Sequence, residues 1–364
     1  MVAVAIKDRA GMWSAEDSLN ELMQLADTAG AEVVGKVIQK LPKPSATSYI
    51  GKGKIEELLA LKESLNYDLL IVDDELTPLQ QNNLEDTLKV KIIDRAALIL
   101  DIFAKRAQTR EGRLQVELAQ HQYLLPRLAG QWSHLERLGA GIGTRGPGES
   151  QLETDKRLIR QRIGRLERHI EEVRRHRALY REHRRKAGIP VVTLVGYTNA
   201  GKSTLLNALS HAGVFVEDRL FSTLDPTTRR LTLPDNSTVL ITDTVGFINK
   251  LPPALITAFR ATLEELAETN ILIHVVDFTS HNAPEQCQTV EDILAVLGVK
   301  DKPRITALNK IDLLLDKEKT WDEKSALDYF SGNTEQPGEN TVFISAAKGW
   351  GLNSLLELVS IVLK

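Results

Sequence analysis

Eight residues near the middle of the chain have the types and the spacing of a phosphate-binding loop. They follow an apolar run at 191–195 and precede a helical pattern at 204–210, and they are Gly196, Tyr197, Thr198, Asn199, Ala200, Gly201, Lys202 and Ser203. In such a loop the backbone N–H groups and the next helix N-terminus surround a phosphate, the lysine reaches the β- and γ-phosphates, and the serine hydroxyl faces Mg²⁺. A plain glycine turn would need neither the lysine nor the serine. We therefore expect all eight residues to contact a nucleotide and Lys202 to be catalytic.

Two segments further along the chain have the features of switch elements that respond to a third phosphate. The first is a polar, loop-like stretch that contains Phe221, Ser222, Thr223, Leu224 and Asp225 and continues to residue 228. One of its threonines should complete the Mg²⁺ shell, and we favour Thr223 over Thr227. The second segment follows a strand pattern at 238–242, begins with Asp243, Thr244, Val245 and Gly246, and continues to residue 250.

The residues of the second segment have distinct expected roles. The Asp243 carboxylate can hold Mg²⁺ through water, and the Gly246 N–H can contact the γ-phosphate and so report its presence. We expect Thr223 and Gly246 to join Lys202 in catalysis. Many hydrolases of this kind place a water-orienting glutamine after Asp-x-x-Gly, but here that residue is Phe247. We therefore expect slow intrinsic turnover, with the missing group or the correct switch geometry supplied by a partner.

Two later strings predict which base the site accepts. Asn309, Lys310, Ile311 and Asp312 follow a strand pattern at 304–308, and Ser345, Ala346 and Ala347 follow one at 342–344. Guanine presents N1–H and its exocyclic amine side by side, so one carboxylate such as Asp312 can accept from both, whereas adenine offers an acceptor and a C–H there. A backbone N–H of the last loop can contact guanine O6. The sequence therefore predicts a preference for GTP over ATP.

The composition indicates a globular protein with two or three domains. The chain has 364 residues, of which 42% are hydrophobic, and a formal net charge of −3. Its only cysteine, Cys287, has no partner for a disulfide, which favours a reducing compartment. No apolar run approaches the roughly 18 residues of a membrane span, and residues 1–7 are too short for a signal peptide. We expect a cytoplasmic monomer without a membrane span.

Residues 1–105 predict a small α/β domain with a mostly parallel sheet of about four strands. Strand patterns at 2–6, 32–38, 68–72 and 90–93 alternate with helical patterns at 14–29, 54–66 and 78–88. The stretch 49–54 carries glycines and lysines at a helix start, an arrangement that can hold a phosphate of a nucleotide or of RNA. We favour a tight turn with solvated lysines, because the spacing matches no complete phosphate-binding fingerprint.

Residues 106–188 predict two long antiparallel helices that pack like a coiled coil. Apolar and aromatic residues recur at steps of three and four, which is typical of a helix packing seam. The first seam contains Leu114, Leu118, His121, Leu125, Leu128, Trp132 and Leu135, and the second contains Ile159, Ile163, Leu166, Ile170, Val173 and Tyr180. Pro126 removes a backbone donor inside the first helix, which predicts a kink.

The connection between the two predicted helices, residues 139–149, is rich in glycine and should form the tip of the hairpin. With five glycines and Arg145 it can follow an irregular RNA surface closely, offering N–H groups and a guanidinium to phosphates and bases. Residues 154–188 contain thirteen Lys or Arg against five Asp or Glu. Part of this charge is ordinary solvated helix surface and part pairs with nearby glutamates, but the surplus predicts a surface that faces a polyanion.

The nucleotide motifs resemble those of the translation-factor-related class of P-loop GTPases, and nearly the whole chain is similar to the HflX family of ribosome-associated GTPases. The strings that carry the second resemblance are LLPRL at 124–128, GIGTRGPGE at 141–149 and TLDPTTR at 223–229. The resemblance implies an α/β N-terminal domain at 1–105, a helical hairpin at 106–188 and a G domain at 189–364. It also implies that Ser203 and Thr223 ligate Mg²⁺. Because the sequence ends after the helical pattern at 352–363, we expect the extra C-terminal domain of some family members to be absent.

The same resemblance implies a function in translation. The three parts would bind the large ribosomal subunit and its ribosomal RNA and split or rescue ribosomes, with GTP hydrolysis acting as a switch. Two other classes stay open: an RNA-binding scaffold that uses GTP only for structural support, and an ATP-driven RNA remodeller that works through residues 1–105. Some relatives of this class use an asparagine at the position of Asn199 to hold K⁺ against the phosphates; the alternative is that Asn199 only braces the loop.

Overall fold

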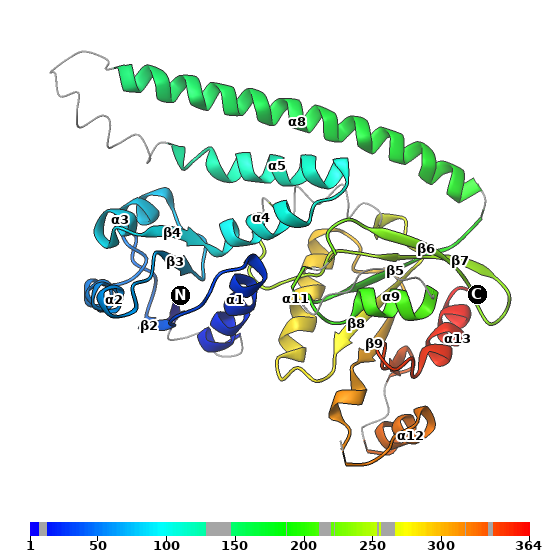
Figure 1. The fold of residues 1–364 in the computed structure, drawn as a ribbon. Helices are drawn as coiled ribbons and strands as arrows, with labels where there is room; N and C mark the ends of the chain where they lie inside the picture. The colour runs from blue at the N-terminus through cyan, green and yellow to red at the C-terminus, as the bar shows by residue number, and fades with distance from the viewer. Residues whose placement is uncertain are drawn as a thin grey trace. The chain divides into compact units, whose positions relative to one another are not determined.

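The computed structural model of the chain describes residues 1–6, 13–128, 147–186, 188–210, 220–221, 223–252, 255, 266–316, 318–333 and 338–364. Within the long helix at 147–186, side chains are described for residues 152–176. The chain forms two compact units, which are residues 1–173 with 252–258 and residues 174–251 with 259–364. Each unit contains its own sheet (Figure 1).

The first unit is built on a four-stranded sheet of order β2-β1-β3-β4, in which the strands pair in parallel. The elements are β1 (Val2–Ile6), α1 (Ala15–Ala29), β2 (Val37–Leu41), α2 (Lys52–Leu65), β3 (Leu69–Val72), α3 (Pro78–Leu88), β4 (Lys91–Asp94) and α4 (Arg95–Arg106). Helix α3 begins at a capping box, in which Thr77 and Gln80 exchange hydrogen bonds around Pro78. The predicted parallel α/β arrangement is confirmed.

Two elements of this unit differ from the prediction. Strand β2 begins at Val37 rather than at residue 32, because its first partner is Val2 at the start of β1 and residues 32–36 have no strand beside them. The loop before β2 instead receives the N-terminal amine, which donates to Gly35 O at 2.7 Å. Helix α4 was not predicted, although Asp94 caps it by accepting from Ala97 N, a helix-start signal that the sequence contains.

The predicted hairpin is formed by α5 (Arg110–Leu124) and α8 (Pro147–Lys186), which run antiparallel (Figure 1). Leu118 of α5 and Leu166 of α8 are buried, and Arg162 of α8 donates to Glu117 of α5 at 2.7 Å. Pro126 interrupts the first predicted helix as expected, because α5 ends at Leu124 and residues 125–127 form a turn, which makes the interruption a break rather than a bend. Proline has no N–H group with which to continue the helical hydrogen bonds, so the helix ends before it. Trp132, Leu135 and the tip at 139–146 lie outside the described residues.

The end of α5 is attached to the edge of the first sheet through Asp94. Arg127 donates to Asp94 Oδ2 at 3.1 Å and to Leu76 O at 2.7 Å, and the Tyr123 hydroxyl donates to Asp94 Oδ1 at 2.9 Å. The Arg127 guanidinium also lies 3.5 Å from the centre of the Tyr123 ring. Arg127 of the LLPRL string and the preceding Tyr123 therefore join the hairpin to the sheet.

The second unit contains a six-stranded sheet of order β10-β9-β8-β5-β7-β6. Strand β6 is antiparallel to β7, and the other neighbouring pairs are parallel. Its elements are β5 (Val191–Gly196), α9 (Lys202–Ser210), β6 (Thr227–Thr232), β7 (Thr238–Asp243), β8 (Ile271–Asp277), α11 (Ala283–Val296), β9 (Arg304–Asn309), η1 (Ile311–Leu314), α12 (Glu323–Asn333), β10 (Thr341–Phe343) and α13 (Leu352–Val362). Buried apolar side chains of the central strands, α9 and α13 pack together and form the core of this unit. The predicted α/β fold class with a C-terminal P-loop domain is confirmed.

Candidate nucleotide-binding site

The predicted nucleotide-binding strings meet at one edge of the second sheet. The phosphate loop follows β5, the Asp243 string begins at the end of β7, the Asn309 string at the end of β9, and the Ser345 string follows β10. Strands β5, β7, β8, β9 and β10 are parallel, so their carboxyl ends lie on the same side. This edge is where parallel α/β sheets bind their ligands.

The backbone of the phosphate loop requires glycine at two positions. A Cβ at Gly196 would lie 2.3 Å from Val275 O, and one at Gly201, where φ is +95°, would lie 2.3 Å from Asn309 Nδ2. A side chain at either position would therefore force the loop away from β8 and from the string after β9. Asn199 also has a positive φ of +60°, a conformation that asparagine tolerates better than most residues.

The side chain of Lys202 is buried and lies under the first residues of the phosphate loop. Its Nζ donates to Tyr197 O at 2.7 Å and to Gly196 O at 3.1 Å. Burial lowers the pKa of Lys202 to about 8, and the nearby Asp243 carboxylate acts in the opposite direction. The ammonium group is thus held inside the loop. An anion bound there would raise the pKa of Lys202 again, because it would stabilise the charged form.

Ser203, Thr223 and Asp243 form a hydrogen-bonded cluster beside the loop. The Ser203 hydroxyl donates to Asp243 Oδ2 at 2.6 Å and lies 2.7 Å from the Thr223 hydroxyl. Asp243 is 1% exposed, and its burial raises the pKa of its carboxyl group. Its Oδ1 has no hydrogen-bond partner among the residues that the structure describes. Two hydroxyls and an unsatisfied carboxylate oxygen are hard oxygen ligands of the type that Mg²⁺ prefers.

The two threonine candidates of the first switch segment occupy different places. Thr223 lies in a loop with its hydroxyl at the Ser203–Asp243 cluster, whereas Thr227 begins β6 and pairs with Asp243 in the β6–β7 ladder. Phe221 lines the same small cavity as Thr223 and is buried. Leu224 is buried and Asp225 is half-buried, and Ser222 lies outside the described residues.

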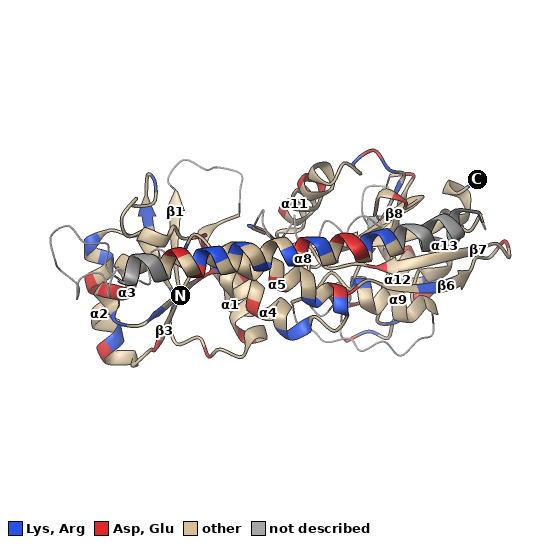
Figure 2. Ribbon diagram, turned by 90° about the horizontal axis from the view of Figure 1, so that it is seen from above, with Lys and Arg blue, Asp and Glu red and all other residues tan. Residues whose placement is uncertain are grey.

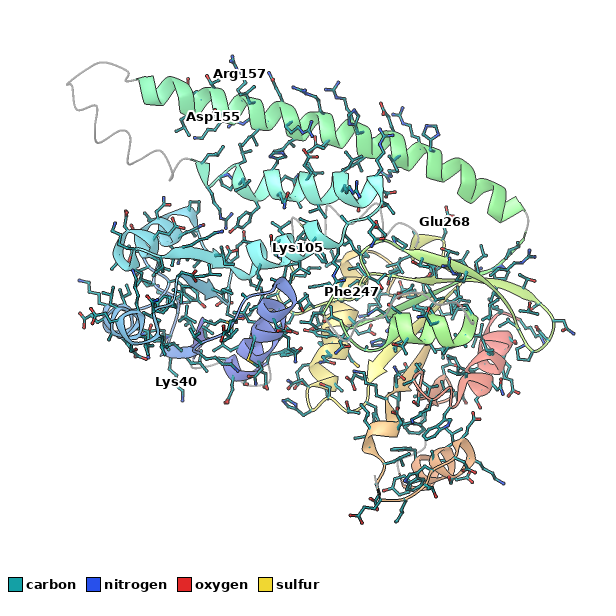
Figure 3. All side chains as sticks on the ribbon, in the orientation of Figure 1. Lys40, Lys105, Asp155, Arg157, Phe247 and Glu268 are labelled. Atoms are coloured by element: carbon teal, nitrogen blue, oxygen red, sulfur yellow. The ribbon has the colours of Figure 1, made fainter. Side chains whose placement is uncertain are left out.

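The second switch segment lies directly against the phosphate loop. Phe247 N donates to Gly196 O at 3.1 Å, and Thr198 N donates to Phe247 O at 2.8 Å. A Cβ at Gly246 would lie 2.7 Å from Thr198 Cα, so only glycine allows this approach. Thr244 donates its hydroxyl to Leu194 O at 2.7 Å, and Val245 is buried. The segment is therefore joined to the loop by backbone hydrogen bonds at Phe247, which Figure 3 labels.

The base-recognition strings are tied to the phosphate loop and to each other. Asn309 Nδ2 donates to Ala200 O at 2.8 Å, while Asn309 Oδ1 accepts from Ala346 N at 2.9 Å. The Ser345 hydroxyl donates to Asp312 Oδ1 at 2.6 Å, which orients that carboxylate. Ile311 is fully buried and Ala347 is exposed. Asn309 thus links three loops, and Asp312 is held beside the last of them.

Sequence reasoning missed two residues that support the site, Asp277 and Asn249. Lys310 Nζ pairs with Asp277 Oδ2 at 2.7 Å at the end of β8, and the Tyr197 hydroxyl accepts from Asn249 N at 2.7 Å. Asp277 ends a buried strand at the same sheet edge, and that signal was available. The contact of Tyr197 with the second switch segment depends on the tertiary approach of two loops and has no sequence signal.

The other phosphate-binding stretch that we considered, residues 49–54, forms a closed turn. Gly51 N donates to Gln39 Oε1 at 2.8 Å, and Lys54 pairs with Glu57 at 2.6 Å. Because the Gly51 N–H and the Lys54 ammonium already have partners in β2 and α2, and Lys52 is exposed, this stretch agrees with the solvated-turn interpretation. No described helix is both long and apolar enough to span a membrane.

Comparisons with known proteins agree with this geometry. Three family profiles match in succession: "GTP-binding GTPase N-terminal" at 16–104, "GTP-binding GTPase Middle Region" at 106–184 and "50S ribosome-binding GTPase" at 191–310. GTPase HflX of Caldanaerobacter subterraneus subsp. tengcongensis is 54% identical over 344 residues, which cover 94% of this chain and 76% of that protein. GTPase HflX of Escherichia coli is 41% identical over 344 residues, covering 94% and 78%.

A solved structure also covers the chain. A GTP-binding protein from the archaeon Sulfolobus solfataricus, determined in complex with GDP, is 27% identical, covers 100% of this chain and 99% of its own, and has a TM-score of 0.47. The identity to the bacterial proteins extends over both units of this chain. Together with the phosphate loop and the guanine-recognition strings, it shows that the chain belongs to the HflX family of GTPases and hydrolyses GTP.

Proposed function

We propose that this GTPase binds the large ribosomal subunit and splits or rescues ribosomes, with GTP hydrolysis as the switch. The observation that supports this most directly is the division of α8 into two faces. Ile159, Ile163, Leu166, Ile170 and Val173 form the seam toward α5 and are buried or half-buried. On the opposite side, as the geometry of an α-helix requires, lie the exposed side chains of Arg157, Arg160, Arg165 and Arg168.

The arginine face of α8, defined as Arg157, Arg160, Arg165 and Arg168, suits RNA phosphates. Figure 2 shows blue Lys and Arg bands repeated along α8, and Figure 3 shows Arg157 on the side of α8 away from α5. A rigid helix with regularly spaced guanidiniums can follow a phosphate backbone, and each contact releases condensed counterions. In this proposal residues 1–105 and 106–188 contact ribosomal RNA in the cytoplasm, and residues 189–364 of the monomer supply the switch.

The Ser203 cluster fits a Mg²⁺ ion. The hydroxyls of Ser203 and Thr223 would ligate the ion directly, and Asp243, which has one unsatisfied buried oxygen within the described structure, would hold it through water. Bound there, Mg²⁺ would neutralise charge on the phosphates of GTP. The hydrogen bonds that now join the three side chains would then be exchanged for contacts to the ion and its water.

The remaining site residues would bind and orient GTP. Lys202, held in the loop by two carbonyls, would reach the β- and γ-phosphates. Asp312 would accept from guanine N1–H and its amine, with Ser345 fixing the carboxylate and the Ala346 loop close to O6. Gly246 N–H would contact the γ-phosphate and connect its presence to the second switch segment.

We also propose that Asn199 helps hold K⁺ against the phosphates. It is exposed at the mouth of the cavity and adopts a positive φ. A monovalent cation there would neutralise charge that develops during phosphoryl transfer. Turnover in K⁺ should exceed turnover in Na⁺ at equal ionic strength, and Asn199→Ala should remove the difference. Equal rates in the two salts would show that Asn199 only braces the loop.

Co-sedimentation with ribosomal subunits tests the main proposal. The full chain should pellet with the large subunit in GTP more than in GDP, ATP or no nucleotide, and binding should weaken steeply as salt rises. Changing the arginine face to glutamine should flatten the plot of log affinity against log salt by up to about three units. The matched control changes four exposed lysines of the other unit to glutamine: Lys300, Lys319, Lys324 and Lys348. Equal loss in both variants, or no dependence on GTP, would contradict the proposal.

A further inference from the structure

Thr198 carries a buried hydroxyl that the described part of the protein leaves without a hydrogen-bond partner. The residue is 6% exposed, and its Oγ1 makes no hydrogen bond there. Other buried threonines of this unit are satisfied: Thr244 donates to Leu194 O at 2.7 Å, and Thr193 bonds to Thr269. A buried hydroxyl without a partner is unfavourable, so such groups are uncommon in folded proteins. The exception at Thr198 therefore needs a physical reason.

The position of Thr198 supplies that reason. It lines the same small cavity as Lys202, Thr223 and Gly246. A Cβ built on Gly246 would lie 2.9 Å from Thr198 Cγ2 and 3.0 Å from Lys202 Nζ, so these three residues converge on one spot. The atom of Thr198 that approaches Gly246 is its methyl carbon, Cγ2. The unsatisfied hydroxyl is carried by the same side chain, which lines the cavity in which Lys202 and Gly246 would contact the γ-phosphate.

The residue that usually orients water cannot do so here. Phe247 is 1% exposed, and its ring has no polar atom. Its backbone is held on both sides, because its N–H donates to Gly196 O at 3.1 Å and its carbonyl accepts from Thr198 N at 2.8 Å. The second of these hydrogen bonds fixes Thr198 against the second switch segment. The reaction therefore needs a polar group from another residue of this chain or from a partner.

We propose that the Thr198 hydroxyl donates a hydrogen bond to the γ-phosphoryl group while this group passes from GTP to water. In that step the water oxygen forms a bond to the γ-phosphorus, the bond from phosphorus to the β–γ bridging oxygen breaks, and its electron pair leaves with GDP. The two protons of the water are divided between inorganic phosphate and solvent. Charge on the equatorial oxygens needs donors that are already in place, and Thr198 is held in place by its own backbone. The inference rests on the triphosphate lying in the 196–203 loop.

The test replaces the hydroxyl by a methyl group of similar size. In Thr198→Val, kcat for GTP should fall roughly 10- to 100-fold, the loss expected for one donor to a charged group. Affinity for GDP with aluminium fluoride, which imitates the transferring phosphoryl group, should fall by a similar factor. Affinity for GDP alone should stay within about twofold, because GDP has no γ-phosphate. Thr198→Ser, which keeps the hydroxyl, should recover most of both losses.

A matched control separates this role from a structural one. Thr193→Val makes the same chemical change at a buried threonine of β5 whose hydroxyl has a partner. It should lower the thermal unfolding temperature and leave the ratio of the two affinities unchanged. Thr198→Val should not lower the unfolding temperature without nucleotide, because it removes an unsatisfied group.

Three results would overturn the proposal. The first is a kcat of Thr198→Val within twofold of the parent, the second an equal loss of affinity for GDP and for its aluminium fluoride complex, and the third a serine variant as impaired as the valine variant. If Thr198→Val does not fold, Thr198→Ala and Thr198→Ser decide by the same comparison. A parent chain that does not bind GDP would instead contradict the placement of the nucleotide.

Discussion

At the scale of single residues, Asp312 carries the expected choice of base. Its carboxylate is already oriented by Ser345 at 2.6 Å, so it can accept two hydrogen bonds from guanine without rearranging. Asp312→Asn exchanges one accepting oxygen for a donating amide, which matches the C2 oxygen of xanthine. We expect GTP affinity to fall at least about tenfold and affinity for xanthosine triphosphate to rise.

A competition assay with the two nucleotides measures this change. Glu318→Gln, an exposed acid of the same unit, is the control and should leave the preference for GTP unaltered. Unchanged selectivity in Asp312→Asn would remove Asp312 from the base site.

His274 predicts how acid affects the second unit. It lies in β8 and is 4% exposed, and burial, with smaller effects of the Arg304 and Lys202 charges, lowers its pKa to about 4 from the usual 6.5. The unfolded chain therefore binds a proton that the folded chain rejects. Stability present above pH 6.5 is lost as the pH falls toward 4, by about 3 kcal/mol.

Urea unfolding at several pH values tests this prediction. The difference in unfolding free energy between the parent and His274→Leu isolates the histidine from the carboxylates that titrate in the same range. This difference should shift by about 3 kcal/mol in favour of the variant between pH 7 and pH 4. A constant difference across that range would show that His274 has the same pKa in the folded and the unfolded chain.

At the scale of elements, the junction between α5 and the first sheet depends on Arg127. Its side chain is 8% exposed and donates to Asp94 Oδ2, Leu76 O and Tyr123 O at 3.1, 2.7 and 2.9 Å. Arg127→Met would leave the buried Asp94 carboxylate without its cation. Because breaking one side of a buried pair costs about 3–5 kcal/mol, we expect a loss of stability of that order.

Thermal and urea unfolding of the full chain measure this loss. Arg113→Met, which changes an exposed arginine of the same helix, is the control and should change stability by less than about 0.5 kcal/mol. If both variants unfold like the parent, the contacts at Asp94 do not hold α5 to the sheet.

At the scale of the whole molecule, the proposed function divides binding of the nucleotide from contact with the ribosome. Residues 141–146 of the tip lie outside the described part of the chain, whereas the nucleotide site is built from the strands of the second unit. Replacing residues 141–148 by a short neutral linker should abolish splitting of ribosomes and leave GTP binding intact. Sucrose-gradient profiles of ribosomes and nucleotide titrations measure the two properties. Splitting at the parent rate would transfer the contact to residues 1–105.

Several features of this protein could be predicted from the sequence because local rules determine them. The phosphate loop, the Asp243 string and the Asn309 string each consist of residues whose side-chain chemistry and spacing limit them to few roles. The alternation of strands and helices in residues 1–105, with caps such as Thr77, was enough to predict the parallel sheet there. The seam of α8 follows from its periodicity, and its arginine face lies opposite.

Tertiary structure decided the features that depend on residues far apart in the chain. The start of β2 is set by its pairing with Val2. The fold also places the hydroxyl of Thr223 beside Ser203, 20 residues earlier in the sequence, whereas Thr227 pairs with Asp243 in the β6–β7 ladder. The contact of Thr198 N with Phe247 O joins two loops that are far apart in the chain. Local patterns cannot encode such contacts, since each depends on where the packed sheet brings two distant loops together.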